Sequence, residues 1–246
     1  MARLAIGLIA LSGLAASLIS VQPAVADEAT LAAGAGFRRP IAEVATAFEK
    51  ASGHKILQTY GHLGQVIAQA KESGKIALVC GDRAVLQKAE GINFSSMAPL
   101  GVGKLVLAFR KGVTLAQPED ITKDDIKRIG IPDQANAIYG KAGRLFLERA
   151  GLAAKIDPKL VAVGTVPQVT SYIVSGEVDA GFINATDAIG AGDKIGGFIE
   201  IDQKYYDRVE VSCGIMDASK DSVAAKEFAR FLETDLARAI LKRYGL

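Results

Sequence analysis

The pattern of apolar and polar positions between residues 30 and 64 predicts two successive strand–loop–helix units. An apolar strand over 31–33 runs into Gly34-Ala35-Gly36, where glycine favours a tight loop. Apolar residues then recur at three- and four-residue spacing from Ile41, which is the spacing of one helix face. Gly53 suits the end of this helix because glycine adopts the left-handed conformation of a C-terminal cap. A second strand follows, and a second glycine loop then precedes another helix.

The rest of the chain repeats this alternation, which predicts an α/β fold with mainly parallel sheets. The further expected strands are 75–80, 104–109, 128–131, 160–163, 178–183 and 209–216, and the further expected helices are 65–72, 83–90, 141–150, 166–175 and one amphipathic helix after Ser222. A capping box predicts a helical turn at 122–125, and a second one starts the helix at 166. We expect two lobes, with 27–108 and 210–246 in lobe 1 and 109–209 in lobe 2.

The two glycine loops, at 34–36 and 61–64, are the candidate binding elements. Each precedes a helix whose first N–H groups have no partner within the helix and carry the positive end of its dipole. Such an end binds anions readily. In parallel sheets both loops lie at the carboxyl ends of strands, where ligands bind. Ordinary βα turns shaped by glycine are the alternative.

The first 26 residues have the features of a cleaved export signal. Arg3 precedes an apolar stretch, and Ala24-Val25-Ala26 fits a small-residue cleavage site. A membrane anchor is the alternative, which the cleavage triplet and the acidic residues after it disfavour. We therefore expect a periplasmic protein with no membrane insertion after cleavage. The formal charge of +2 gives no reason to expect a nucleic-acid partner.

The chain has two cysteines, Cys80 and Cys213. An exported protein meets oxidising conditions, in which a disulfide persists. Each cysteine also lies in an apolar run, where buried free cysteine is common. The sequence leaves both alternatives open.

Three segments resemble the periplasmic molybdate-binding proteins, the solute receptors of ABC importers. They are AFEKASG at 47–53, SGEVDAG at 175–181 and KEFARFLETDLARAILKRYGL at 226–246. The resemblance extends over nearly all of the chain after the signal. It implies a two-lobed periplasmic binding protein of type II, with a cleft that closes on a small oxyanion such as molybdate or tungstate. It further implies an ABC-transporter permease as partner, a monomer, and no cofactor or metal.

The resemblance also implies five ligand positions, and most of them are altered in this chain. Serines of the family correspond to Gly36 and Leu63, an alanine to Tyr139, and a tyrosine to Asn184, whereas the valine is kept as Val166. Backbone donors can remain at these positions, but three side-chain hydroxyls are lost and one, that of Tyr139, is gained. Since a hydrogen bond to a charged group contributes roughly 1.5–3 kcal/mol, losing two or three would weaken oxyanion binding by about a hundredfold or more.

Basic residues beside the two loops are candidates to replace the lost donors. Arg38, Arg39 and His62 lie in or next to the loops, and arginine binds carboxylate or phosphate with two parallel hydrogen bonds. That chemistry would favour an organic acid or a phosphate compound over molybdate. Solvent-facing positions for the arginines, a surface position for His62, and simple packing of Tyr139 and Asn184 between the lobes are the alternatives.

Motifs of the common enzyme classes are missing from the sequence. There is no GxSxG, HExxH or CxxC, and neither Gly-Lys104 nor the first glycine loop completes a nucleotide-binding pattern. We therefore expect a receptor and no catalytic residues. An exported transferase and a non-transport sensor or adhesin on the same fold remain alternatives.

Overall fold

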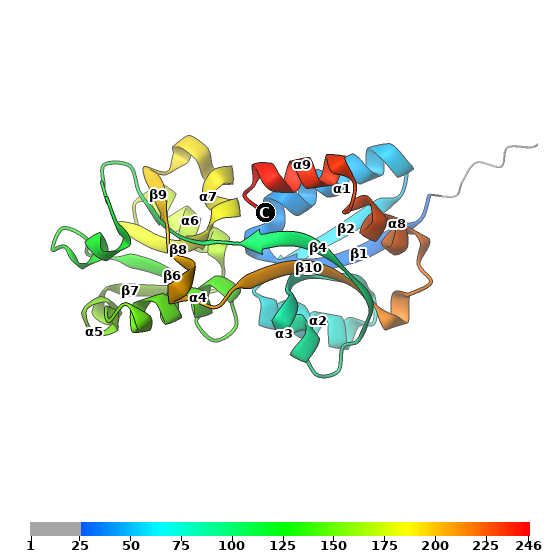
Figure 1. Ribbon diagram of the computed structural model, residues 1–246, viewed down its shortest axis with the longest axis horizontal. Helices are drawn as coiled ribbons and strands as arrows, with labels where there is room; N and C mark the ends of the chain where they lie inside the picture. Colours follow the sequence, from blue (N-terminus) through cyan, green and yellow to red (C-terminus); the bar gives the residue numbers. More distant parts are fainter. Residues whose placement is uncertain (1–25) are drawn as a thin grey trace, which may run out of the picture.

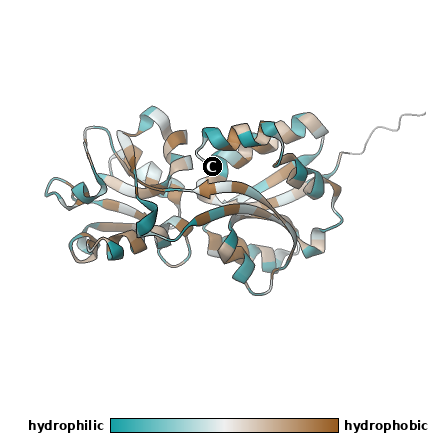
Figure 2. Cartoon of the chain, in the orientation of Figure 1, coloured by the Kyte–Doolittle hydropathy of each residue, from teal (hydrophilic) through white to brown (hydrophobic). Residues whose placement is uncertain are grey.

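The computed structural model describes residues 26–246 and consists of two α/β lobes side by side (Figure 1). The predicted signal peptide lies outside the described residues, apart from Ala26. Apolar residues concentrate on the strands of both sheets, whereas polar residues cover much of the outer surface of the helices (Figure 2). Among the described helices, none is long and apolar enough to span a bilayer.

The first sheet is built from both ends of the chain. Its order is β2 (Lys55–Gly61), β1 (Glu28–Gly34), β3 (Ile76–Asp82), β10 (Val209–Met216) and β4 (Phe94–Gly103). The pairs of β1 with β2 and β3 are parallel, whereas β10 runs antiparallel to β3 and β4. The helices α1 (Arg38–Ser52), α8 (Val223–Phe231) and α9 (Asp235–Arg243) cover one face, and α2 (Leu63–Ser73) and α3 (Arg83–Lys88) cover the other (Figure 1).

The second sheet comes from the middle of the chain. Its order is β7 (Leu160–Val163), β6 (Ile129–Pro132), β8 (Ala180–Asn184), β5 (Leu105–Phe109) and β9 (Gly197–Glu200). It too is mixed, because β6 pairs parallel with β7 and β8 while β5 is antiparallel to β8 and β9. The helices α4 (Ile138–Arg149) and α5 (Ala153–Ile156) lie on one face, and α6 (Val166–Ser175) and α7 (Ala185–Ala191) lie on the other (Figure 1).

Two neighbouring segments connect the sheets. The chain crosses first at Lys104, between β4 and β5, and returns before β10. Because all of β5 belongs to the second sheet, this first crossing precedes the expected position near residue 108. The edge strand β4 was not expected from the sequence, since it contains Pro99 and Gly101. Proline is tolerated on an edge strand because one side of that strand needs no hydrogen-bond donors.

The two cysteines form a disulfide within the first sheet. Cys80 on β3 and Cys213 on β10 are direct partners across the antiparallel pair, with Cα atoms 4.0 Å apart. Both residues are fully buried. Of the two alternatives that the sequence left open, the structure contains the disulfide.

Two helix predictions were wrong in detail. The single C-terminal helix is divided into α8 and α9, because Thr234 accepts a hydrogen bond from the N–H of Ala237 and so begins a new helix. The helical turn expected at 122–125 lies earlier, at Pro118–Thr122, where the Asp120 carboxylate accepts from the N–H of Ala116 at 2.8 Å. The helix predicted at 166–175 is confirmed.

Candidate functional site

A small cavity lies between the two lobes. Its volume is about 20 Å³, little more than the space that one water molecule needs. Residues of both lobes line it: Gly34, Ala35, Gly36, Phe37, Gly61, His62, Leu63, Ala137, Ile138, Tyr139, Thr165 and Val166. In this arrangement of the lobes the cavity leaves no room for a large organic ligand.

Helix N-termini from both lobes converge on this cavity. Lobe 1 contributes Gly36 in the 3₁₀ turn that leads into α1, and Leu63 at the start of α2. Lobe 2 contributes Tyr139 at the start of α4 and Val166 at the start of α6. The first N–H groups of a helix have no partner within it, and the helix dipole adds positive potential there. Four such ends around one small cavity form an environment suited to an anion.

Side chains fix two of these helix starts. The Nδ1 atom of His62 accepts a hydrogen bond from the N–H of Gln65 at 3.1 Å and so caps α2. The Gln168 side chain accepts from the N–H of Thr165 at 3.0 Å and so caps α6. Since these groups satisfy N–H groups elsewhere in the first turn, they hold the remaining ones in place around the cavity.

Gly36 has no side chain because Asn184 of the other lobe fills the space beside it. A Cβ atom on residue 36 would lie 2.9 Å from Oδ1 of Asn184. The Nδ2 atom of Asn184 donates to the Gly36 carbonyl at 2.9 Å, and the Thr186 hydroxyl donates to the same oxygen at 2.8 Å. Asn184 is therefore a contact between the lobes, directly behind the cavity wall.

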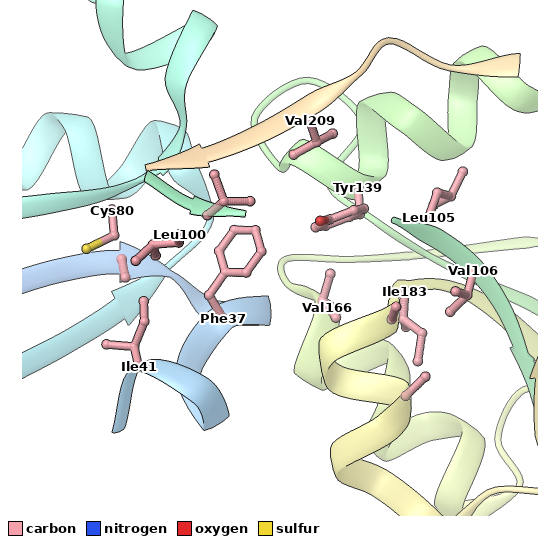
Figure 3. Packing of buried hydrophobic residues seen from close by; sticks show 14 of the residues in the cluster. Phe37, Ile41, Cys80, Leu100, Leu105, Val106, Tyr139, Val166, Ile183 and Val209 are labelled. Carbon is pink, nitrogen blue, oxygen red and sulfur yellow. The ribbon is translucent and has the colours of Figure 1, made fainter. Parts of the chain in front are cut away.

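Leu63 and Tyr139 make the cavity wall largely apolar. Leu63 is buried and packs over Gly81 of β3, where a Cβ atom would come within 2.6 Å of its methyl group. The Tyr139 ring lies edge-on to that of Phe37, with centroids 6.0 Å apart (Figure 3). Burial raises the pKa of the Tyr139 hydroxyl, so this group stays protonated at neutral pH and can donate.

The basic candidates occupy three different environments. His62 lines the cavity. Arg38 is exposed, its guanidinium carbon lies 5.9 Å from the centre of the Tyr60 ring, and it is not among the lining residues. Arg39 reaches across the lobe interface to Asp187, with 3.2 Å between Nε and Oδ1. Only His62 of the three is therefore placed to touch an anion in the cavity.

Sequence reasoning did not find the polar contacts that α7 makes across the interface. Asp187 is buried, accepts a hydrogen bond from the Thr170 hydroxyl and pairs with Arg39. Thr186 shares the Gly36 carbonyl with Asn184. The polar run Asn184-Ala-Thr-Asp187 at the end of an apolar strand was the available signal. Its partners, Gly36 in the turn before α1 and Arg39 on α1, lie about 150 residues earlier in the chain.

Comparison with known proteins identifies the family. Residues 29–246 match the model of the bacterial extracellular solute-binding proteins. The chain is 26% identical to the molybdate-binding protein ModA of Rhodobacter capsulatus over 227 residues, which is 91% of this chain and 89% of that one. It is 28% identical to ModA of Azotobacter vinelandii over 228 residues, which covers 90% of each chain.

The solved structures agree with the sequence comparisons. The periplasmic molybdate-binding protein of Azotobacter vinelandii superposes with a TM-score of 0.81 at 25% identity, covering 88% of this chain and 97% of that one. This likeness confirms the predicted two-lobed α/β fold of a type II periplasmic binding protein. The relatives are named as binding proteins and not as enzymes, which agrees with the expected receptor. The chain belongs to the bacterial extracellular solute-binding protein family.

Proposed function

We propose that this chain is the periplasmic receptor of an ABC importer and that it captures a small oxyanion between its lobes. The convergence of four helix N-termini on one cavity of about 20 Å³ is the observation that carries the proposal. Molybdate and tungstate are the first anions to test, because two relatives are named for molybdate. A monomer that delivers this anion to a permease fits the family.

The proposed ligand contacts come from both lobes. Backbone N–H groups near Gly36, Leu63, Tyr139 and Val166 would point at the anion, and His62 would add a side-chain donor. Asn184 would position Gly36 through its hydrogen bond to the Gly36 carbonyl oxygen. Each N–H bond to a charged oxygen contributes about 1.5–3 kcal/mol, so a few bonds of this kind suffice for micromolar binding.

The two sheets with their helices form the proposed moving lobes. Residues 27–103 and 209–246 would form lobe 1, and 105–208 would form lobe 2, with the crossing segments as the hinge. Because the cavity walls come from both lobes, the anion would enter when they separate and be enclosed when they meet. An organic acid or a phosphate compound is the alternative ligand class, and one larger than molybdate would need the lobes to stand further apart.

Calorimetry on residues 27–246 with molybdate, tungstate, sulfate, phosphate and citrate tests this proposal. We expect micromolar or tighter binding of at least one inorganic oxyanion. His62→Ala should weaken it about tenfold, because it removes a lining donor and the cap of α2. Arg38→Ala is the matched control and should leave the affinity unchanged, because Arg38 does not line the cavity. Absence of micromolar binding by any of these anions would overturn the proposal.

A further inference from the structure

A second hollow lies between the lobes, beside the segment that returns to β10. Residues in the ranges 82–88 of lobe 1, 138–145 of lobe 2 and 207–209 of the return segment line it, and we call it the hinge groove. Its volume is about 240 Å³, and it shares only Ile138 with the small cavity described above. Its two helices, α3 and α4, lie on the same side of the crossing segments (Figure 1). The hinge groove is therefore a separate place where one molecule could contact both lobes.

Apolar side chains from all three segments form part of the wall of the hinge groove. They are Val85, Ile138, Ala142, Leu145 and Val209. Removing apolar surface of a ligand from water against such a wall is favourable. In another protein, an apolar cavity of about 150 Å³ holds one benzene molecule. The larger hinge groove thus has room for a ring or a short chain that carries a polar group.

Two lysines line the hinge groove, one from each lobe. Lys88 is on α3 and Lys141 is on α4, and both are exposed. Among the described residues, the lysines that form ion pairs are Lys104, Lys123 and Lys204. The ammonium groups of Lys88 and Lys141 therefore remain available to bind the anionic group of a ligand.

The carboxylate of Asp82 limits the negative charge that the hinge groove accepts. Asp82 lines the groove and is only 7% exposed, and its Oδ1 accepts a hydrogen bond from the N–H of Val85 at 2.9 Å. Burial raises the pKa of this carboxyl, and the charge of Lys141 counteracts part of the shift. Asp207 and Arg208 already pair with residues that do not line the groove. Since a nearby carboxylate repels a dianion more strongly than a monoanion, a singly charged anion fits better.

We propose that the hinge groove binds a small organic carboxylate with an apolar body, such as an aromatic or short-chain fatty acid. Its carboxylate lies between Lys88 and Lys141, and its apolar body packs against Val85, Leu145 and Val209. Because this ligand contacts both lobes, it favours the arrangement of the lobes in which the groove has this shape. The site is separate from the small cavity and does not depend on the oxyanion proposed to bind there.

Calorimetry at neutral pH on residues 27–246 tests this proposal with benzoate as the probe. Four comparison compounds each lack one feature of benzoate: acetate has no apolar body, benzyl alcohol has no charge, benzylammonium has the opposite charge, and phenyl phosphate is a dianion. We expect benzoate to bind with a dissociation constant below about 1 mM, and each of the four to bind at least about tenfold more weakly. Equal binding of benzyl alcohol or benzylammonium would contradict the role of the lysines.

Replacing Lys88 and Lys141 together by glutamine should weaken benzoate binding about tenfold. Each lysine is exposed, so its loss alone should cost roughly threefold. The matched control is Lys55→Gln together with Lys155→Gln, which makes the same change in net charge. It removes one exposed lysine from each lobe, and neither lines the hinge groove, so the affinity for benzoate should persist.

A last variant distinguishes the hinge groove from the small cavity. His62 lines the small cavity and not the hinge groove, so His62→Ala should leave benzoate binding unchanged. If His62→Ala weakens benzoate binding and the loss of Lys88 and Lys141 does not, benzoate occupies the small cavity and the inference is wrong. Absence of benzoate binding, or equal losses in the two lysine double variants, would also overturn it.

Discussion

At the scale of single residues, the contact between Gly36 and Asn184 explains how the cavity wall is built. Residue 36 is a glycine because Oδ1 and Nδ2 of Asn184 lie about 3 Å from where its Cβ would be. Its backbone is in an ordinary right-handed turn, since it is not among the glycines with positive φ. The glycine is thus required by the neighbouring lobe and not by the conformation of its own loop.

Gly36→Ala should therefore weaken anion binding about tenfold without lowering the stability of the protein. The new methyl group meets Asn184 only when the lobes are together, whereas alanine suits the turn itself and restricts the unfolded chain. Calorimetry and thermal unfolding of the free protein measure the two effects.

The double variant Gly36→Ala, Asn184→Ala gives the control for this prediction. Once the Asn184 side chain is removed, the methyl group at residue 36 meets no obstacle from it. Adding Gly36→Ala to the Asn184→Ala variant should then change the affinity less than about threefold. An equal loss in both backgrounds would contradict the steric explanation.

At the scale of secondary-structure elements, α1 and α7 hold the lobes together beside the cavity. Arg39 on α1 pairs with Asp187 on α7, whose side chain is only 5% exposed. The stem of Arg39 lies in a notch at Gly190, where a Cβ would be 2.0 Å from its Cδ. Asp187 also accepts a hydrogen bond from Thr170 on α6, the helix whose first residue lines the cavity. This contact therefore connects two helices whose N-termini form the site.

Arg39→Ala should raise the rate constant of anion dissociation about tenfold. The substitution leaves the Asp187 carboxylate without its cation in the closed form, whereas separated lobes would expose it to water. Because Arg39 is half-exposed, we expect a smaller effect than the loss of a fully buried ion pair would have.

Stopped-flow displacement of the bound anion measures this dissociation rate constant. Arg149→Ala removes the exposed pair with Asp207 and is the control, with no change expected; equal effects of both variants would argue against α1 and α7.

The disulfide between β3 and β10 should contribute to stability and not to ligand specificity. It links residues 133 positions apart, so the unfolded chain loses considerable freedom when the bond is formed. Replacing Cys80 and Cys213 together by alanine should lower the free energy of unfolding by about 2–5 kcal/mol. Urea titration measures the loss. Anion affinity should stay within about threefold, because neither cysteine lines the cavity; a large change in affinity would show that β10 transmits strain to the site.

At the scale of the whole molecule, the connection between the lobes allows them to move as units. Each sheet has its own covering helices, and the covalent links are the two crossing segments (Figure 1). The polar contacts between the lobes, by contrast, lie next to the cavity, at Gly36, Arg39 and the bond from the Gly64 N–H to the carbonyl of Asn136. Separating the lobes would therefore break few polar contacts. A bound anion would compensate for the conformational freedom that the lobes lose when they are held together.

Anion binding should shift the lobes toward the closed arrangement and reduce the radius of gyration. Small-angle X-ray scattering of residues 27–246, with and without the tightest anion from calorimetry, measures the change. Gly36→Ala provides the comparison, because its methyl group obstructs full closure even at saturating anion. If the wild-type radius is the same with and without anion, rigid lobes explain the binding and the hinge proposal is wrong.

The sequence alone determined the α/β class and most of the elements, because periodicity and capping signals are local. The helix at 166–175 and the strand at 209–216 have the predicted bounds. Local signals also indicated the two glycine loops and the helix starts. They did not give β4, whose proline and glycines are tolerated only because its position is at the edge of a sheet.

Only the tertiary structure decided which of the candidate residues meet. It placed His62 in the cavity wall and Arg38 on the surface, although both lie in or next to a glycine loop in the sequence. It paired Cys80 with Cys213 and set Asn184 against Gly36, contacts that join segments more than 130 residues apart. Local sequence patterns carry no information about such distant partners. The pairing of β3 with β10 in the first sheet fixes the disulfide, whereas the packing of the two lobes against each other fixes the contact of Asn184 with Gly36.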